Sequence, residues 1–81
     1  MLTVSQIRAA RGLLDWTQTD LANAAGLAVN SIKNIEGGVT DPNPKTLNAL
    51  RTALEVAGVV LLTPGDMRDG GHGVRLRKVE R

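Results

Sequence analysis

The chain has 81 residues, no cysteine, a single histidine and one aromatic side chain, Trp16. This length allows one small hydrophobic core. The lack of cysteine excludes disulfides and thiolate metal sites, and one histidine is too few for a conventional zinc site, so we expect no cofactor or metal. Without Phe or Tyr the core must consist of Leu, Ile, Val and Ala, which favours close-packed helices.

The N-terminus has no signal-peptide pattern, and the longest apolar run, residues 57–62, is too short to span a bilayer. We therefore expect a cytoplasmic protein. The net charge is +2. Cations and anions balance over residues 1–62, so the excess lies in residues 63–81. Because Lys and Arg supply most non-specific affinity for DNA, strong DNA binding requires the basic tail or a second subunit; otherwise the partner is not DNA.

Capping boxes predict the first two helices. Thr3 and Gln6 have the spacing of such a box, and apolar residues follow at helical intervals to about residue 14. Thr17 and Asp20 form a second candidate box, before a helix that continues to residue 25. The acidic residue is also favourable at the positive end of the helix dipole.

Gly26 supplies the left-handed turn that ends the second helix. A third helix is predicted over about residues 28–36, and it begins at Ala28 without a capping side chain. Asn43 and Pro44 are suited to cap and open a fourth helix, which Gly58 ends. The apolar spacing predicts inward-facing residues on both sides of the Gly26 turn, namely Leu21, Ala22, Ala25, Leu27, Ile32 and Ile35.

The last part of the chain has the pattern of strands. Residues 59–62 are β-branched and apolar, as in a strand buried on both faces, and residues 74–79 begin as an alternation of apolar and basic side chains. A lone hairpin is marginally stable, and an apolar edge invites pairing. We therefore predict that residues 59–81 are a β extension that mediates dimerisation, through Val59, Val60, Leu61, Leu62, Val74 and Leu76. The sequence leaves open whether the strands pair within one chain or between two.

The fold class expected is mostly α, a compact four-helix bundle with a short C-terminal strand pair. Residues 3–58 resemble the Cro/phage-repressor (Xre) type of helix-turn-helix protein. The motifs that carry the resemblance are Gln6-Ile7-Arg8-Ala9-Ala10-Arg11, Gln18-x-x-Leu21-Ala22, Gly26, Ile32 and Ile35-Glu36-Gly37, followed by a proline-initiated helix. It implies that residues 1–58 form a helix-turn-helix DNA-binding domain.

The resemblance also implies roles for individual residues. Gln18 would pack against a phosphate, Lys33 would lie near the backbone or a base edge, and Arg11 and Glu36 would form a structural ion pair. The positions that match base-contacting sites are Val29, Asn30 and Asn34, with Ser31 in the same helix. The protein would be a homodimeric transcriptional repressor bound to double-stranded DNA, with two half-sites about one helical turn, roughly 10 bp, apart.

Several residues have two interpretations. Asn30 and Asn34 are either base readers, since Asn both donates to and accepts from an adenine edge, or solvated polar residues. Val29 either touches a thymine methyl group or closes the core. Trp16 is either a plug between the first two helices or a surface for a protein partner. The basic residues Arg75, Arg77 and Lys78 either touch the DNA backbone or solubilise the outer face of a strand.

No catalytic constellation is present in the sequence, so we do not expect an enzyme. Two positions depart from the family pattern: the loop after the third helix carries Asp41 instead of a cation, and Ala28 replaces the usual Ser or Thr. Asp41, the neutral helical body and the apolar strand after the fourth helix motivate an alternative function, in which the same fold binds another transcription regulator as an antiactivator or antitoxin-like adaptor.

Overall fold

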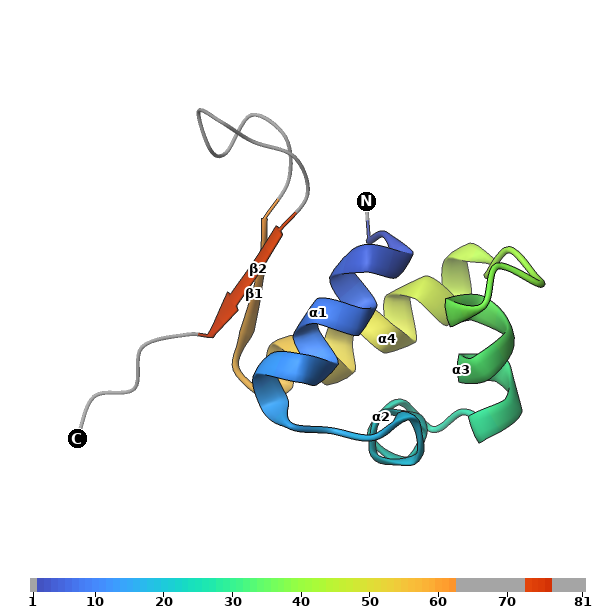
Figure 1. Ribbon diagram of the computed structural model, residues 1–81, viewed down its shortest axis with the longest axis horizontal. Helices are drawn as coiled ribbons and strands as arrows, with labels where there is room; N and C mark the ends of the chain where they lie inside the picture. The colour runs from blue at the N-terminus through green and yellow to red at the C-terminus, as the bar shows by residue number, and fades with distance from the viewer. Residues whose placement is uncertain (1, 63–72, 77–81) are drawn as a thin grey trace.

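The computed structural model describes residues 2–62 and 73–76. Four helices are followed by a two-stranded antiparallel sheet (Figure 1), which confirms the predicted fold class. The elements are α1 (Val4–Leu14), α2 (Gln18–Ala25), α3 (Val29–Glu36), α4 (Pro44–Val56), β1 (Val59–Leu62) and β2 (Gly73–Leu76). Of the predicted second strand, residues 77–79 lie outside the described residues, as do Arg77 and Lys78 of the basic tail.

The helix ends follow from local sequence. Both predicted capping boxes are formed. The Thr3 hydroxyl accepts from the backbone N–H of Gln6 at 3.1 Å, and the Thr17 hydroxyl accepts from the backbone N–H of Asp20 at 3.0 Å. Gly26 ends α2 in the left-handed conformation, with φ 71°, which costs glycine little. Local sequence thus fixes the starts of α1 and α2 and the turn that ends α2.

The start of α3 has no side-chain cap, because its N-cap residue is Ala28. Replacing Ala28 with Ser is therefore expected to stabilise the protein by about 1 kcal/mol. In a domain of this size, that gain raises the melting temperature by about 4–8 °C. Thermal unfolding followed by circular dichroism measures it. Ala9→Ser, at an exposed position within α1, is the matched control and is expected to gain nothing; equal melting temperatures for the two variants would contradict the prediction.

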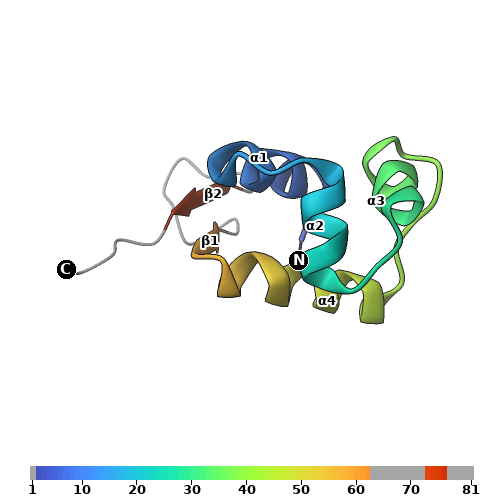
Figure 2. The same cartoon turned by 90° about the horizontal axis from the view of Figure 1, so that it is seen from below.

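Aliphatic side chains from all four helices form the core. Leu21, Leu50 and Leu54 are completely buried, and Val59 joins them from β1. In Figure 2, α1 and α4 lie on opposite sides with α2 between them, and α3 lies at the end of the molecule away from the strands. The other buried core residues are Leu2, Ile7, Ala10, Ala22, Ile32, Ile35 and Ala53, while Ala25 and Leu27 are half-buried.

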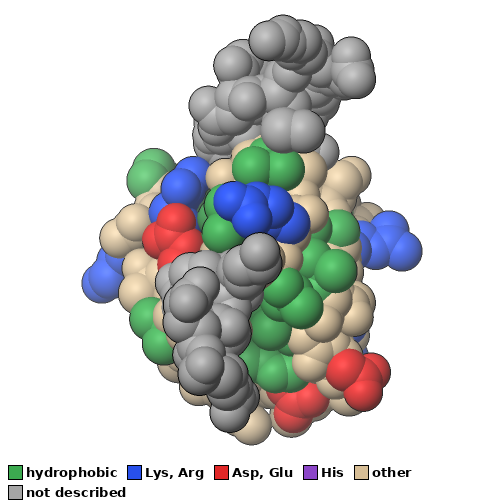
Figure 3. Space-filling view, turned by 90° about the vertical axis from the view of Figure 1, so that its left-hand side faces the viewer, with side chains coloured by type: hydrophobic (Ala, Val, Ile, Leu, Met, Phe, Trp, Pro, Cys, Tyr) green, Lys and Arg blue, Asp and Glu red, His purple; other side chains and the backbone are tan. Residues whose placement is uncertain are grey.

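The two strands pair with each other within the chain, which answers the question that the sequence left open. Val59 lies opposite Leu76, and Leu61 lies opposite Val74. Val59, Leu61 and Val74 pack against the core, because β1 contacts α4 and β2 contacts α1. The expectation of a strand buried on both faces was wrong: the helices cover one face, and beyond Val59 the strand is half-buried. Figure 3 shows hydrophobic side chains on the side of the molecule where the strands lie.

Gln6 attaches the sheet to α1, and its side chain is 1% exposed. Its amide nitrogen donates to the carbonyl oxygen of Leu62 at 2.7 Å and to that of Gly73 at 3.0 Å. Its amide oxygen accepts from the backbone N–H of Thr3 at 2.9 Å. The capping side chain of α1 thus also holds the last residue pair of the β-ladder.

Candidate nucleic-acid interface

One face of α3 is exposed, and it carries polar side chains. Ile32 and Ile35 anchor the helix in the core, whereas Asn30, Lys33 and Asn34 are exposed. Because Asn30 and Asn34 are four residues apart, they lie on the same side of the helix. Within residues 2–62 and 73–76, neither side-chain amide makes a hydrogen bond to the protein, so both keep their donors and acceptors for another molecule.

The two remaining predicted contact residues of α3 lie at the margins of this face. Val29 and Ser31 are half-buried. Val29 packs against the core cluster, which agrees with the interpretation that it closes the core, although part of its surface remains accessible. The exposed surface of α3 is therefore dominated by the two asparagines and the lysine.

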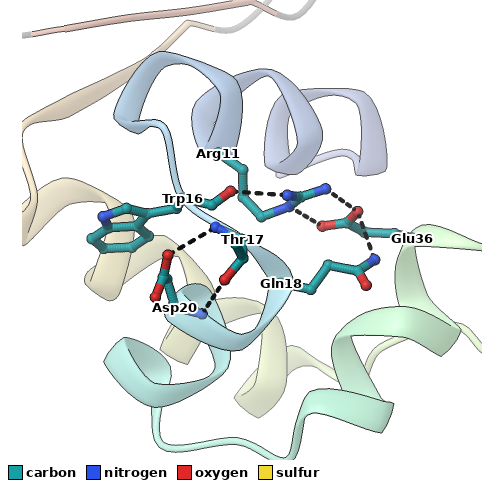
Figure 4. A network of polar contacts seen from close by, with 6 residues as sticks. All are labelled: Arg11, Trp16, Thr17, Gln18, Asp20 and Glu36. Atoms are coloured by element: carbon teal, nitrogen blue, oxygen red, sulfur yellow. Dashed lines mark hydrogen bonds and ion pairs between the residues drawn. The ribbon is translucent and has the colours of Figure 1, made fainter.

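A polar network fixes α3 to the other helices (Figure 4). Arg11 of α1 donates two hydrogen bonds to the Glu36 carboxylate, each 2.8 Å long, and a third of 3.0 Å to the carbonyl oxygen of Trp16. Gln18, the first residue of α2, donates to Glu36 at 3.2 Å. The expected partners Arg11 and Glu36 thus meet in a bidentate pair, a geometry that fixes orientation as well as distance.

The network stabilises the charged forms of both partners. Burial raises the pKa of Glu36, but the hydrogen bonds from Arg11 and Gln18, with the positive charges of Arg11 and Arg8, outweigh it and lower that pKa below its ordinary value. The hydrogen bond to Glu36 raises the pKa of Arg11. Glu36 therefore remains a carboxylate at neutral pH and holds Arg11 in place.

Gln18, expected at a phosphate, is half-buried at the start of α2. One hydrogen of its amide group is used in the bond to Glu36, and the amide nitrogen carries a second. The same side chain that joins α2 to α3 thus retains donor capacity.

Two hollows flank the exposed face of α3, and their charges differ. The first, of about 320 Å³, is lined by Arg8, Arg11, Gln18, Lys33, Glu36 and Gly37. The second, of about 280 Å³, is lined by Leu27, Ser31, Asn34, Ile35, Thr40, Asp41, Pro42, Asn43 and Thr46. The first hollow has more cations than anions, whereas the only charged residue of the second is Asp41.

A family model described as helix-turn-helix matches residues 7–61. The chain belongs to the Cro/C1-type helix-turn-helix family. This confirms the resemblance, and α2, Gly26 and α3 are its helix-turn-helix. The family is one of DNA-binding regulators, so DNA binding is the function at the level that the family shows. The comparison with curated proteins returned no match.

The residues expected to mediate dimerisation are divided by the sheet. Val59, Leu61 and Val74 pack against the chain's own core. Val60 and Leu62 are half-buried on the opposite face, and Leu76 is 46% exposed at the end of β2. The surface left for a partner is therefore smaller than the sequence implied.

Trp16 is half-buried, but it does not simply fill the space between the first two helices. It lines an apolar groove of about 570 Å³ that α2 and α4 form with it. The other lining residues are Ala24, Ala25, Ala49, Thr52, Ala53, Val56 and Ala57.

Within residues 2–62, no helix has the length and apolarity required to cross a membrane.

Sequence reasoning missed two residues of this part of the molecule. Gln6 was assigned only the capping role, because its two carbonyl partners are more than fifty residues away. Arg8 was included in the family motif but was given no role, although it lies three residues before Arg11 and so on the same side of α1. That spacing was the available signal for Arg8.

Proposed function

We propose that this helix-turn-helix protein is a sequence-specific transcriptional regulator, a homodimeric repressor that inserts α3 into the major groove. The observation that carries the proposal is the exposed face of α3. Its unpaired asparagines project from a helix that Arg11, Glu36 and Gln18 hold at a fixed orientation. A prearranged helix loses little conformational freedom when it binds.

Each residue of the interface has a chemical role in this proposal. Asn30 and Asn34 read bases, because an Asn amide matches the donor and acceptor of an adenine edge in the major groove. Gln18 and Lys33 contact the backbone, which fixes the register of the helix on the duplex. Val29 and Ser31, at the margin of the face, contact the groove wall.

The proposed dimer joins two hairpins through the sheet face turned away from the helices, which carries Val60 and Leu62, and through the end of β2, where Leu76 is exposed. The hairpin lies at the end of the molecule opposite α3 (Figures 1 and 2), along a longest dimension of 33 Å. A dimer joined there holds its two α3 helices far apart. We therefore expect half-sites two turns apart, about 21 bp, rather than the single turn expected from the sequence.

Selection from random duplex DNA by the purified protein tests this function. The expected result is an enriched pseudo-palindrome, and the spacing of its halves reports the dimer contact. A spacing of about 10 bp would place that contact closer to α3 and exclude the hairpin. No enrichment by protein with a helical circular dichroism spectrum would contradict sequence-specific DNA binding.

Replacing Asn34 with Ala is expected to cost about 1–3 kcal/mol at one base position and to relax the preference there. Repeating the selection with the variant and measuring its affinity for the enriched site checks this. Asn48→Ala is the matched control, since Asn48 is an exposed asparagine on α4. An unchanged base preference in Asn34→Ala would show that α3 is misplaced in the proposal.

The groove beside Trp16 favours a second candidate function. Its lining is almost entirely apolar, and Val56 at its margin is 78% exposed. Exposed apolar surface of this kind is typical of a protein-binding site. In this alternative the protein is an adaptor that sequesters another regulator, and its binding is insensitive to salt, whereas DNA affinity falls steeply with salt.

A further inference from the structure

We propose that Arg8 is a phosphate-binding residue, in the hollow between α1 and α3 that also contains the proposed backbone-contacting residues Gln18 and Lys33. The inference rests on the proposed function, because it names the group that the DNA-binding surface would hold beside α3. It also assigns a role to a residue of the family motif for which the resemblance implied none.

The hollow is lined by three cations and one anion, so it carries an excess of positive charge. Arg11 and Glu36 neutralise each other in their bidentate pair. Among the described residues, the ion pairs are Arg11–Glu36 and Arg51–Glu55, so Arg8 and Lys33 have no carboxylate partner there. Both are exposed and line the same hollow. Two cations are thus available to one external anion.

The position of these cations matches the wall of a major groove. A helix inserted into the groove has phosphates on both of its sides, and Lys33 stands beside Asn34 on that helix. Arg8 lines the same hollow from α1, and its positive charge helps to lower the pKa of Glu36, which also lines the hollow. A guanidinium group presents five N–H donors in a planar fork that suits phosphate oxygens. The remaining hydrogen of the Gln18 amide completes the set of donors.

The other side of α3 lacks such a site. The second hollow contains Asp41 and no cation, and a carboxylate repels phosphate. The duplex would therefore be held on the α1 side of α3 and left free on the loop side. Because only the hollow on the α1 side has cations available for phosphate, we expect Arg8 to contribute strongly to the backbone contact.

The test measures the affinity of the full chain for a random-sequence duplex at several salt concentrations. Each phosphate neutralised contributes about 0.9 to the slope of log affinity against log salt. Arg8→Gln is expected to lower the slope by about 0.9 for each protomer bound. Raising the salt concentration from 50 to 200 mM then weakens binding of the variant about threefold less, per protomer, than binding of the wild type. Arg8→Lys is expected to keep most of the slope.

Arg51→Gln removes the same charge from α4, where Arg51 already lies 3.7 Å from Glu55, and is expected to leave the slope unchanged. Equal slopes for the wild type and Arg8→Gln would overturn the phosphate site while leaving DNA binding intact. An equal fall of slope in Arg51→Gln would also overturn it, because net charge alone would then explain the effect. A wild type without salt-dependent affinity would overturn this site and the proposed function together.

Discussion

Replacing Glu36 with Gln is expected to destabilise the protein by about 2–3 kcal/mol at neutral pH. The glutamate side chain is 5% exposed and receives two bonds from Arg11 and one from Gln18. Removing one partner of a buried pair leaves the other charge uncompensated, which costs about 3–5 kcal/mol when both are fully buried. The Arg11 side chain is 20% exposed, so water compensates part of the loss.

Urea unfolding at neutral pH measures this difference. The control is Glu55→Gln, which breaks the exposed pair with Arg51, in which the nearest atoms are 3.7 Å apart. Exposed pairs of this kind contribute about 0–1 kcal/mol. Equal losses in the two variants would contradict the structural importance of the Arg11–Glu36 pair. The Glu36 variant is also expected to bind DNA more weakly, since α3 loses its link to α1 and α2.

The same pair predicts a pH dependence of stability. The pKa of Glu36 is lowered in the folded protein, whereas in the unfolded chain it has its ordinary value of 4.5. The unfolded state therefore binds more protons below that value, and stability falls as the pH decreases through 4.5 toward the folded pKa. The stability difference between the wild type and Glu36→Gln is expected to shrink in this window. If the stability difference between the two proteins were the same at all pH values, Glu36 could not be the cause of the pH dependence.

Gln6→Leu is expected to lower the free energy of unfolding by about 2–4 kcal/mol, although the two side chains are similar in size. The substitution leaves the carbonyl oxygens of Leu62 and Gly73 without this donor and the Thr3 N–H without its acceptor. A buried polar group left unsatisfied costs about 1–3 kcal/mol. The free energy of unfolding, measured in urea, checks the prediction.

Thr3→Ala separates the two roles of Gln6. It removes the hydroxyl that caps α1, at a cost of about 1 kcal/mol, and leaves the bonds from Gln6 to the strands in place. Hydrogen exchange of the strand amides is expected to accelerate more in Gln6→Leu than in Thr3→Ala. Equal acceleration would mean that Gln6 acts only through the helix cap.

The features that sequence reasoning predicted are local. Both capping boxes, the Gly26 turn and the proline at the start of α4 act over a few residues, and all of them are present. Ile32 and Ile35 were expected in the core from helical spacing alone, and they are buried. The family pattern identified the fold because its motifs combine these local signals.

The features that escaped prediction depend on contacts between distant parts of the chain. The pairing of β1 with β2 is one such contact. The burial of Val59 depends on another, the packing of the helices on one face of the sheet. Gln6 reaches carbonyls 56 and 67 residues away, and no sequence spacing reports such a bond. Arg8 lies in the family motif, but its proposed role depends on the hollow that α1 and α3 form together.

Contact between α3 and DNA is tested most directly by the amide chemical shifts of the protein. Isotopically labelled protein titrated with a random-sequence duplex at low salt is expected to show its largest shifts in residues 29–36 and at Gln18, with the amides of β1 unchanged. Shifts concentrated along the groove formed by Trp16, Ala49 and Val56, or absent from α3, would contradict the account.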